Sequence, residues 1–322
     1  KKNFKPSSMK FKPAVLSLLL LSILLSSSCD SLEDKTGRFF LKGNEKMDEN
    51  DPNSAIEFYM EAIRLDSTFS DAYYTKGLAH LQLQQWEQAI EAFGFAIRYR
   101  SSYEDAFFQR GLAYLDFGEF YKAREDAKAL EKLAPKDWRP YFLRGLTEEK
   151  LKNFEEAMVA FREAASLAPD NSDILVNQAT LFYYQDQVDS AKAILEKAEI
   201  INPMEPNLHN LRSMILFEEN NYEGALEAVE KAITLDKGQA YFYNNKGLYL
   251  LYLNELEEGL ALINQSLAMN PSNPFALRNK GIYYTLKGEK VAALSFLEDL
   301  AQNYPDMDLV QEYLEKARTL KN

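Results

Sequence analysis

The chain has 322 residues and carries 49 acidic and 37 basic side chains, which gives a formal net charge of −12. A chain this acidic repels phosphate backbones, so nucleic acid is excluded as an expected partner. Glycine and proline are too scarce for a disordered chain, and a single cysteine excludes an intrachain disulfide framework.

Residues 1–28 are predicted to be a signal peptide. Lys10 and Lys12 precede an apolar stretch over 14–25, which is too short to span a bilayer comfortably but suits the apolar core of a signal peptide. Met9 would then be the true start. The segment ends in LSSSC, which resembles the lipobox of bacterial lipoproteins, and this resemblance implies that Cys29 receives a diacylglycerol. The alternative is an ordinary secretory signal in which Cys29 is incidental.

Lipidation at Cys29 would make residues 29–35 a lipidated cysteine followed by a short tether. The remainder of the chain holds 32 basic and 49 acidic residues, a net charge of −17, because all five bases before Cys29 leave with the signal peptide. The expected location is extracytoplasmic and membrane-anchored. The outer membrane, at its periplasmic face or at the cell surface, is preferred to the inner membrane.

From residue 36 onward the sequence repeats with a period of 34 residues and no insertion. The eight units start at Thr36, Ser70, Glu104, Trp138, Ser172, Pro206, Ala240 and Pro274. Position 8 of the unit is glycine in six copies and alanine or serine in the others, and position 20 is alanine in seven copies and glycine in one. Position 4 is bulky in most copies, and position 32 is proline in five.

This pattern predicts a helical hairpin in each unit. Apolar residues at positions 4, 8 and 11, and again at 20, 24 and 27, follow helical spacing, and small residues suit the point where two helices cross most closely. The pattern resembles the tetratricopeptide repeat family. The resemblance implies an all-α fold, a right-handed superhelical α-solenoid of eight 34-residue hairpins over 36–307. Residues 308–322 predict a capping helix whose apolar face holds Leu309, Val310, Tyr313, Leu314 and Ala317.

The same resemblance places repeat positions 2, 5, 9, 12 and 13 on a concave face that binds ligands. Aromatic rings there suit a peptide, and asparagine amides can bond its backbone. The expected peptide-binding residues are Tyr74, Phe108, Phe142, Tyr183, Tyr184, Phe217, Asn210, Asn244, Tyr252 and Arg278. One hypothesis is that an apolar peptide segment of an envelope protein binds around Tyr74, Phe108 and Phe142. The alternative is that these rings pack between neighbouring helices.

Position 7 is basic in seven of the eight units, as in Lys42, Arg110 and Lys246. Such a row of bases could line a groove for an acidic ligand. The preferred interpretation is structural: the aliphatic stems pack between helices while the charges pair with acids on the second helices. The acids available for this are Glu57, Glu91, Glu125 and Glu227.

Catalytic chemistry is not expected. The two histidines, His80 and His209, fall in different repeats, and CxxC, HExxH, GxSxG and GxxxxGK motifs are absent. Paired carboxylates such as Glu148-Glu149 and Glu218-Glu219 are interpreted as solvated helix surface. The sequence therefore predicts a non-enzyme with no metal site and no cofactor.

The function predicted from the sequence is a membrane-anchored protein–protein interaction scaffold or adaptor in the bacterial envelope. Its partners would be other envelope proteins, bound through peptide segments in the concave groove. The alternative is a receptor or carrier lipoprotein that captures a small ligand or glycan for an uptake system, with groove aromatics stacking on sugar rings.

Overall fold

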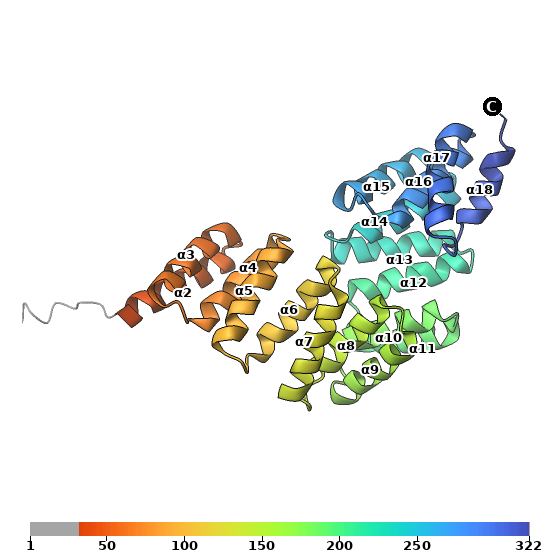
Figure 1. The fold of residues 1–322 in the computed structure, drawn as a ribbon. Helices are drawn as coiled ribbons and strands as arrows, with labels where there is room; N and C mark the ends of the chain where they lie inside the picture. The colour runs from red at the N-terminus through yellow and green to blue at the C-terminus, as the bar shows by residue number, and fades with distance from the viewer. Residues whose placement is uncertain (1–31, 322) are drawn as a thin grey trace, which may run out of the picture. The chain divides into compact units, whose positions relative to one another are not determined.

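The computed structural model describes residues 32–321, which form seventeen α-helices and no strand. Sixteen of these helices make eight hairpins, and α18 follows the last (Figure 1). The hairpins are α2 (Leu32–Asp48) with α3 (Pro52–Leu65), α4 (Ser70–Gln82) with α5 (Trp86–Tyr99), α6 (Glu104–Phe117) with α7 (Phe120–Leu133), α8 (Arg139–Lys150) with α9 (Phe154–Leu167), α10 (Ser172–Tyr184) with α11 (Val188–Ile201), α12 (Pro206–Glu218) with α13 (Tyr222–Leu235), α14 (Ala240–Tyr252) with α15 (Leu256–Met269), and α16 (Pro274–Leu286) with α17 (Lys290–Asn303). The predicted all-α repeat architecture is therefore confirmed.

The chain divides into two compact units, unit 1 over residues 1–134 and unit 2 over residues 135–322. Helices α2–α7 belong to unit 1, and α8–α18 belong to unit 2. Within each unit the two helices of a hairpin pack along each other, and the second helix also contacts the first helix of the next hairpin. Each hairpin thus shares its apolar core with its neighbours in the same unit, as stacked repeats require.

The small residue at position 8 lies where the two helices of a hairpin cross. A Cβ built on Gly43 would lie 2.3 Å from a ring atom of Tyr59, and one built on Gly145 would lie 2.4 Å from a ring atom of Phe161. Both rings occupy position 24 of the unit and are buried. Any larger residue at position 8 would therefore push the ring or the helix axis aside.

The turn inside every hairpin has one geometry that the residue pattern did not predict. Position 15 has a left-handed backbone in all eight units, with φ between 56° and 84°. The residues are Asn50, Gln84, Gly118, Lys152, Asp186, Asn220, Asn254 and Gly288. In each unit the backbone amide of position 16 donates a hydrogen bond to the carbonyl oxygen of position 11, at 2.8–2.9 Å. This is the hydrogen bond that closes a helix in the Schellman motif. Only two of the eight are glycine, so six turns adopt this conformation without the residue that suits it best.

The two ends of the array differ from the prediction in detail. Residues 32–35, expected in a tether, form the first turn of α2, where Glu33 and Asp34 favour a helix N-terminus. At the other end α18 (Val310–Thr319) packs against α16 and α17, and Val310, Tyr313, Leu314 and Ala317 are buried. Leu309 precedes the helix with a left-handed backbone, φ 66°, and still packs against the core.

The predicted signal peptide, Met9 and Cys29 lie outside the described residues. Among residues 32–321, none of the helices combines the length and the apolar character needed to cross a bilayer.

Candidate partner-binding surface

The histidines and the acidic groups of the described residues assemble no reactive centre. His80 Nδ1 lies 2.7 Å from Gln85 Oε1, and His209 Nε2 lies 2.8 Å from the Pro203 carbonyl oxygen, so both rings serve local packing. Burial lowers the pKa of each, which keeps both imidazoles neutral near pH 7. Within residues 32–321 no three His, Cys, Asp or Glu side chains come together in an arrangement that could hold a metal ion.

The aromatic residues at position 5 pack onto the second helix of their own hairpin. Tyr74 lies 5.7 Å from the ring of Phe93 and 4.9 Å from that of Tyr103, and it is only half-buried. Phe142 lies 5.9 Å from Phe161 and is buried. Phe108, also half-buried, is the third member of this column. Much of the surface of these rings is therefore covered by other residues of the protein. Peptide binding around them stays a prediction.

The predicted polar half of the groove is a hydrogen-bonded seam between first helices of unit 2. Asn245 on α14 donates to Asn210 Oδ1 on α12 at 2.9 Å, and Asn279 on α16 donates to Asn244 Oδ1 on α14 at 2.8 Å. Asn210 and Asn244 are buried, and Asn244 is only 2% exposed. Position 6 of one repeat thus bonds position 5 of the repeat before it, and these amides join neighbouring helices.

Arg278 extends this seam as a buried cation. Its side chain is 7% exposed, its Nε donates to Asn279 Oδ1 at 3.0 Å, and its Nη1 donates to the Asp308 carbonyl oxygen at 3.2 Å. Burial lowers the pKa of Arg278 to about 10, so it remains charged at neutral pH. Its two nearest acceptors are neutral oxygens, which hold the guanidinium in place between α16 and the segment before α18.

The remaining predicted residues form aromatic clusters at the C-terminal turns of first helices. Phe217 contacts Tyr252 at 4.8 Å between ring centroids and Tyr249 at 5.1 Å. Tyr183 lies 5.8 Å from Tyr184 and donates a hydrogen bond to Glu218 on α12. Tyr183, Phe217 and Tyr252 are half-buried, whereas Tyr184 is 51% exposed. Of the ten predicted site residues, Tyr184 presents the most open side chain.

Two carboxylates beside this cluster were interpreted wrongly from the sequence as solvated. Glu148 is buried and accepts a hydrogen bond from Asn153 Nδ2 at 2.8 Å. The Glu149 side chain is 12% exposed, and burial raises its pKa. Its charge acts on the hydroxyl of Tyr184, whose pKa is raised first by burial and then by Glu149. The position of Glu149 in the same slot of the repeat as Tyr183 was the available signal.

Four of the seven basic residues at position 7 pair with second-helix acids, in line with the structural interpretation. Arg110 makes a bidentate pair with Asp126, with N–O distances of 2.8 and 2.6 Å, and Arg212 makes one with Glu199 at 2.9 and 2.7 Å. Lys246 pairs with Glu230 at 2.9 Å. None of these acids is among those named from the sequence.

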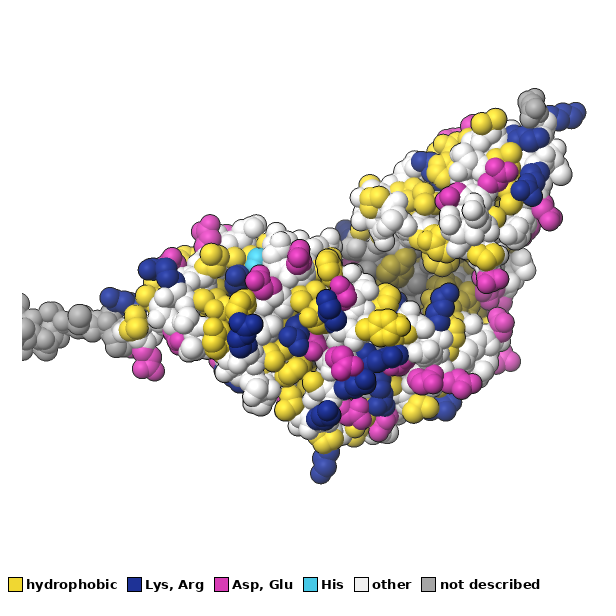
Figure 2. Space-filling view, in the orientation of Figure 1, with side chains coloured by type: hydrophobic (Ala, Val, Ile, Leu, Met, Phe, Trp, Pro, Cys, Tyr) yellow, Lys and Arg dark blue, Asp and Glu magenta, His cyan; other side chains and the backbone are white. Residues whose placement is uncertain are grey.

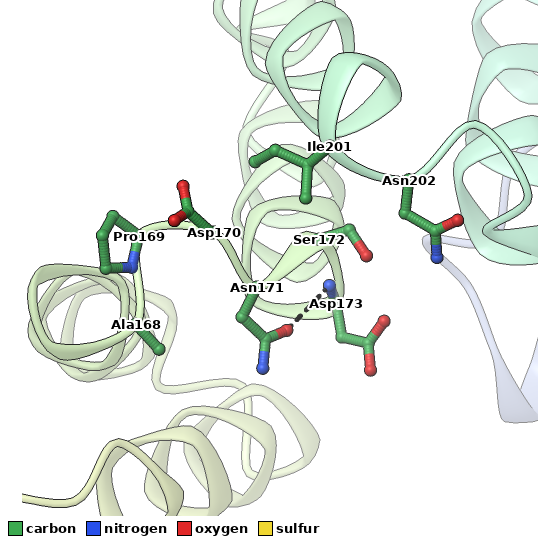
Figure 3. Close-up of a pocket in the computed structure, with 8 residues that line it drawn as sticks. All are labelled: Ala168, Pro169, Asp170, Asn171, Ser172, Asp173, Ile201 and Asn202. Atoms are coloured by element: carbon green, nitrogen blue, oxygen red, sulfur yellow. Dashed lines mark hydrogen bonds between the residues drawn. The ribbon is translucent and has the colours of Figure 1, made fainter.

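A hollow of about 660 Å³ lies at the start of α10, lined by the loop 168–173 with Ile201 and Asn202 (Figure 3). Asn171 caps α10 by accepting hydrogen bonds from the amides of Asp173 and Ile174, at 3.0 and 3.3 Å. The polar atoms of the loop therefore serve the helix terminus, and the hollow is open. Burial raises the pKa of Glu205 to about 7, and the neighbouring carboxyl group of Asp173 adds to this increase.

Comparison with known proteins identifies the repeat. Models of the tetratricopeptide repeat match residues 38–69, 58–91, 77–118, 108–172, 150–215, 206–239 and 244–308. No curated protein matches the sequence.

Two solved structures share the fold at low sequence identity. The APC/C hetero-tetramer Cut9–Hcn1 has a chain that is 14% identical with a TM-score of 0.67; the match covers 93% of this chain but only 59% of that one. A tetratricopeptide repeat protein from Parabacteroides merdae is 17% identical with a TM-score of 0.61, covering 88% of this chain and 99% of that one. Because the repeat models match nearly the whole described chain and the hairpins have the predicted geometry, this protein belongs to the tetratricopeptide repeat family.

Proposed function

We propose that this protein is a non-catalytic, membrane-anchored scaffold of the bacterial envelope that holds partner proteins by peptide segments. The tetratricopeptide repeat fold supports a protein–protein interaction scaffold in general. The observation that carries the finer proposal is the exposed ring of Tyr184 beside Tyr183, at the C-terminal turn of α10. The open ring of Tyr184 and the half-buried ring of Tyr183 together offer aromatic contact area, and tyrosine is enriched at protein interfaces.

The distribution of polar contacts supports the same region. The amides of the Asn210–Asn279 seam bond one another, so they serve the fold, while the rings at the helix ends retain free surface. Figure 2 shows one face of the molecule, on which hydrophobic side chains lie among acidic and basic ones. Such a mixed surface suits a partner that is bound and released, since a wholly apolar surface would aggregate.

Anchoring is proposed through a lipid on Cys29, in an outer-membrane lipoprotein whose repeats lie outside the cytoplasm. The support is the LSSSC segment after a short apolar stretch. The first described helix begins at Leu32, three residues beyond Cys29, so the array would start close to the membrane surface.

Site-directed photocrosslinking in cells tests the scaffold. A benzoylphenylalanine at position 184 should capture one envelope protein, identified by mass spectrometry and by a reciprocal pull-down. The control position is Tyr121 on the second helix α7, an aromatic that is more exposed than Tyr184, at 70% against 51%, and that should not capture that protein. Capture of the same protein from both positions, or capture of a glycan alone, would refute the proposal.

Metabolic labelling with an alkyne fatty acid tests the anchor separately. The wild-type chain should incorporate the label and fractionate with the outer membrane, and the Cys29→Ala variant should lose both properties. A labelled Cys29→Ala variant would show that the cysteine is not the site of attachment.

A further inference from the structure

Both units of the mature chain are acidic. Residues 135–322 hold 29 acidic and 19 basic side chains, a net charge of −10, and residues 29–134, which remain after the predicted signal peptide, hold 20 and 13, a net charge of −7. The field around unit 2 therefore attracts cations and repels anions, and it speeds the approach of a positively charged partner. This observation concerns the partner's charge alone and does not locate a contact.

Tyr184 is one of the exposed aromatic residues of unit 2, and the first helices before and after its own each carry an acid, at Glu149 and Glu218. The tyrosine–glutamate surface consists of Glu149 on α8, Tyr183 and Tyr184 on α10, and Glu218 on α12. Tyr183 is fixed by its ring contact with Tyr184, at 5.8 Å, and by its hydrogen bond to Glu218. Within the described residues the Tyr184 hydroxyl has no hydrogen-bond partner, and half of its side chain is open. The surface thus offers a fixed ring, an open ring and two carboxylates from three successive first helices.

The charges around this surface leave room for a further cation. Lys150 Nζ lies 3.7 Å from Glu149, and because its side chain is 53% exposed, this long ion pair is weak enough for another cation to replace it. Arg278 is buried and bonded to Asn279 and Asp308, so it does not reach Glu149 or Glu218 as an ion-pair partner. Lys192 pairs with Glu219, the residue after Glu218. Burial raises the pKa of Glu149, which shows that its charged form is poorly solvated in the free protein. A cation bound beside it would stabilise the charged carboxylate.

We propose that the tyrosine–glutamate surface binds a lysine or arginine side chain of a partner peptide, with the cation between Glu149 and the face of Tyr184. The inference rests on the proposed scaffold function and names the chemistry of its ligand. A tyrosine face attracts a cation through its quadrupole, and a partly desolvated carboxylate beside it strengthens the contact. Glu218 orients Tyr183 and adds to the negative potential. An apolar or acidic segment would gain neither contact.

Fluorescence anisotropy with defined peptides tests this inference on the full mature chain. The probe is a labelled twelve-residue peptide in which lysine alternates with leucine, and the comparison peptides carry glutamine or glutamate in place of lysine. The lysine peptide should bind at least tenfold more tightly than the glutamine peptide, and the glutamate peptide should not bind. The Glu149→Gln/Glu218→Gln variant and the Tyr184→Ala variant should each weaken lysine-peptide binding about tenfold.

A matched variant separates this surface from general attraction. Glu155→Gln/Glu156→Gln removes the same charge from two exposed positions at the start of α9 in the same unit and should change binding less than twofold. An equal loss in both double variants would overturn the proposed site, as would tight binding of the glutamate peptide. If the glutamine peptide binds with the same affinity to the wild type and to every variant, the proposed cation site is refuted but the scaffold function is not. If none of the three peptides binds, the cation site is refuted, and photocrosslinking from position 184 still tests the scaffold function separately. Circular dichroism of each variant checks that it is folded.

Discussion

The contact between Gly145 and Phe161 makes a quantitative prediction about how the hairpins close. A Cβ at position 145 would lie 2.4, 2.5 and 2.9 Å from three atoms of the Phe161 ring, whereas ordinary contacts begin near 3.4 Å. The buried ring would have to move by about 1 Å, and overpacking of this kind costs roughly 1–3 kcal/mol. Alanine gains about 1 kcal/mol over glycine inside a helix. We expect Gly145→Ala to reduce the free energy of unfolding by about 1 kcal/mol.

The fifth repeat supplies the compensating change, since Ala179 and Leu195 occupy the two corresponding positions there and both are buried. Phe161→Leu alone should cost about 1.5 kcal/mol by leaving space above the glycine. The double variant should cost less than either single variant, with a coupling of about 2 kcal/mol. Urea denaturation followed by circular dichroism and by Trp138 fluorescence measures this, because Trp138 contacts Phe142, which contacts Phe161.

A control substitution has the opposite expected sign. Gly37 lies within α2 and has no heavy atom within 4 Å of a built Cβ, so Gly37→Ala should stabilise by up to 1 kcal/mol. The reasoning is refuted if the changes in the free energy of unfolding of Gly145→Ala and Phe161→Leu are additive, or if Gly145→Ala stabilises the protein. Either result would show that the ring of Phe161 does not require glycine at position 8.

Three further predictions follow from the turns, one carboxylate and the seam. Lys152→Gly should raise the free energy of unfolding by about 0.5–1 kcal/mol and Gly118→Ala should lower it by about 1, in urea denaturation, because both positions have φ above +60°. The pKa of Glu205 is about 7 in the folded state and 4.5 ordinarily, so folding favours the protonated carboxyl group. The free energy of unfolding should therefore rise by about 1 kcal/mol as the pH falls from 8 to 5, after allowance for solvent screening. The Glu205→Gln variant should lack this rise. Asn279→Leu should cost about 2–4 kcal/mol in the same assay, because it strands the bonded groups of Asn244 and Arg278; a cost below 1 would contradict the seam's structural role.

The period of the sequence predicted the hairpins because every repeat solves the same packing problem. A small residue at position 8 faces a bulky one at position 24 in seven of the eight repeats, the exception being the third, which has Ala127. The left-handed turn at position 15 escaped the prediction because five different residue types occupy it. Six of the eight residues are Asn, Asp or Gly, which adopt this backbone most readily, but Gln84 and Lys152 adopt it as well, so the helix-closing hydrogen bond also sets the conformation.

The candidate site was less accessible to prediction because exposure depends on the neighbouring repeat. Position 5 holds the buried Asn244 and the half-buried Tyr74 at equivalent places, and each is covered by a different residue, Asn279 of the next repeat in one case and Tyr103, which directly precedes the next repeat, in the other. The ion-pair partners were missed because neighbouring residues of a helix point in different directions. Arg110 pairs with Asp126 and not with Glu125, since one residue corresponds to about 100° around a helix.

The seam and the tyrosines together indicate how this protein would choose a partner. Asparagine amides could bond any peptide backbone, but Asn210 and Asn279 use theirs to join first helices. A peptide arriving at unit 2 therefore meets rings and carboxylates before it meets free amides. Rings and carboxylates distinguish side chains by charge and shape, whereas amides bond the backbone that all peptides share. Selection by the partner's cationic side chains follows from this division, because the groups that would ignore sequence are already occupied by the fold.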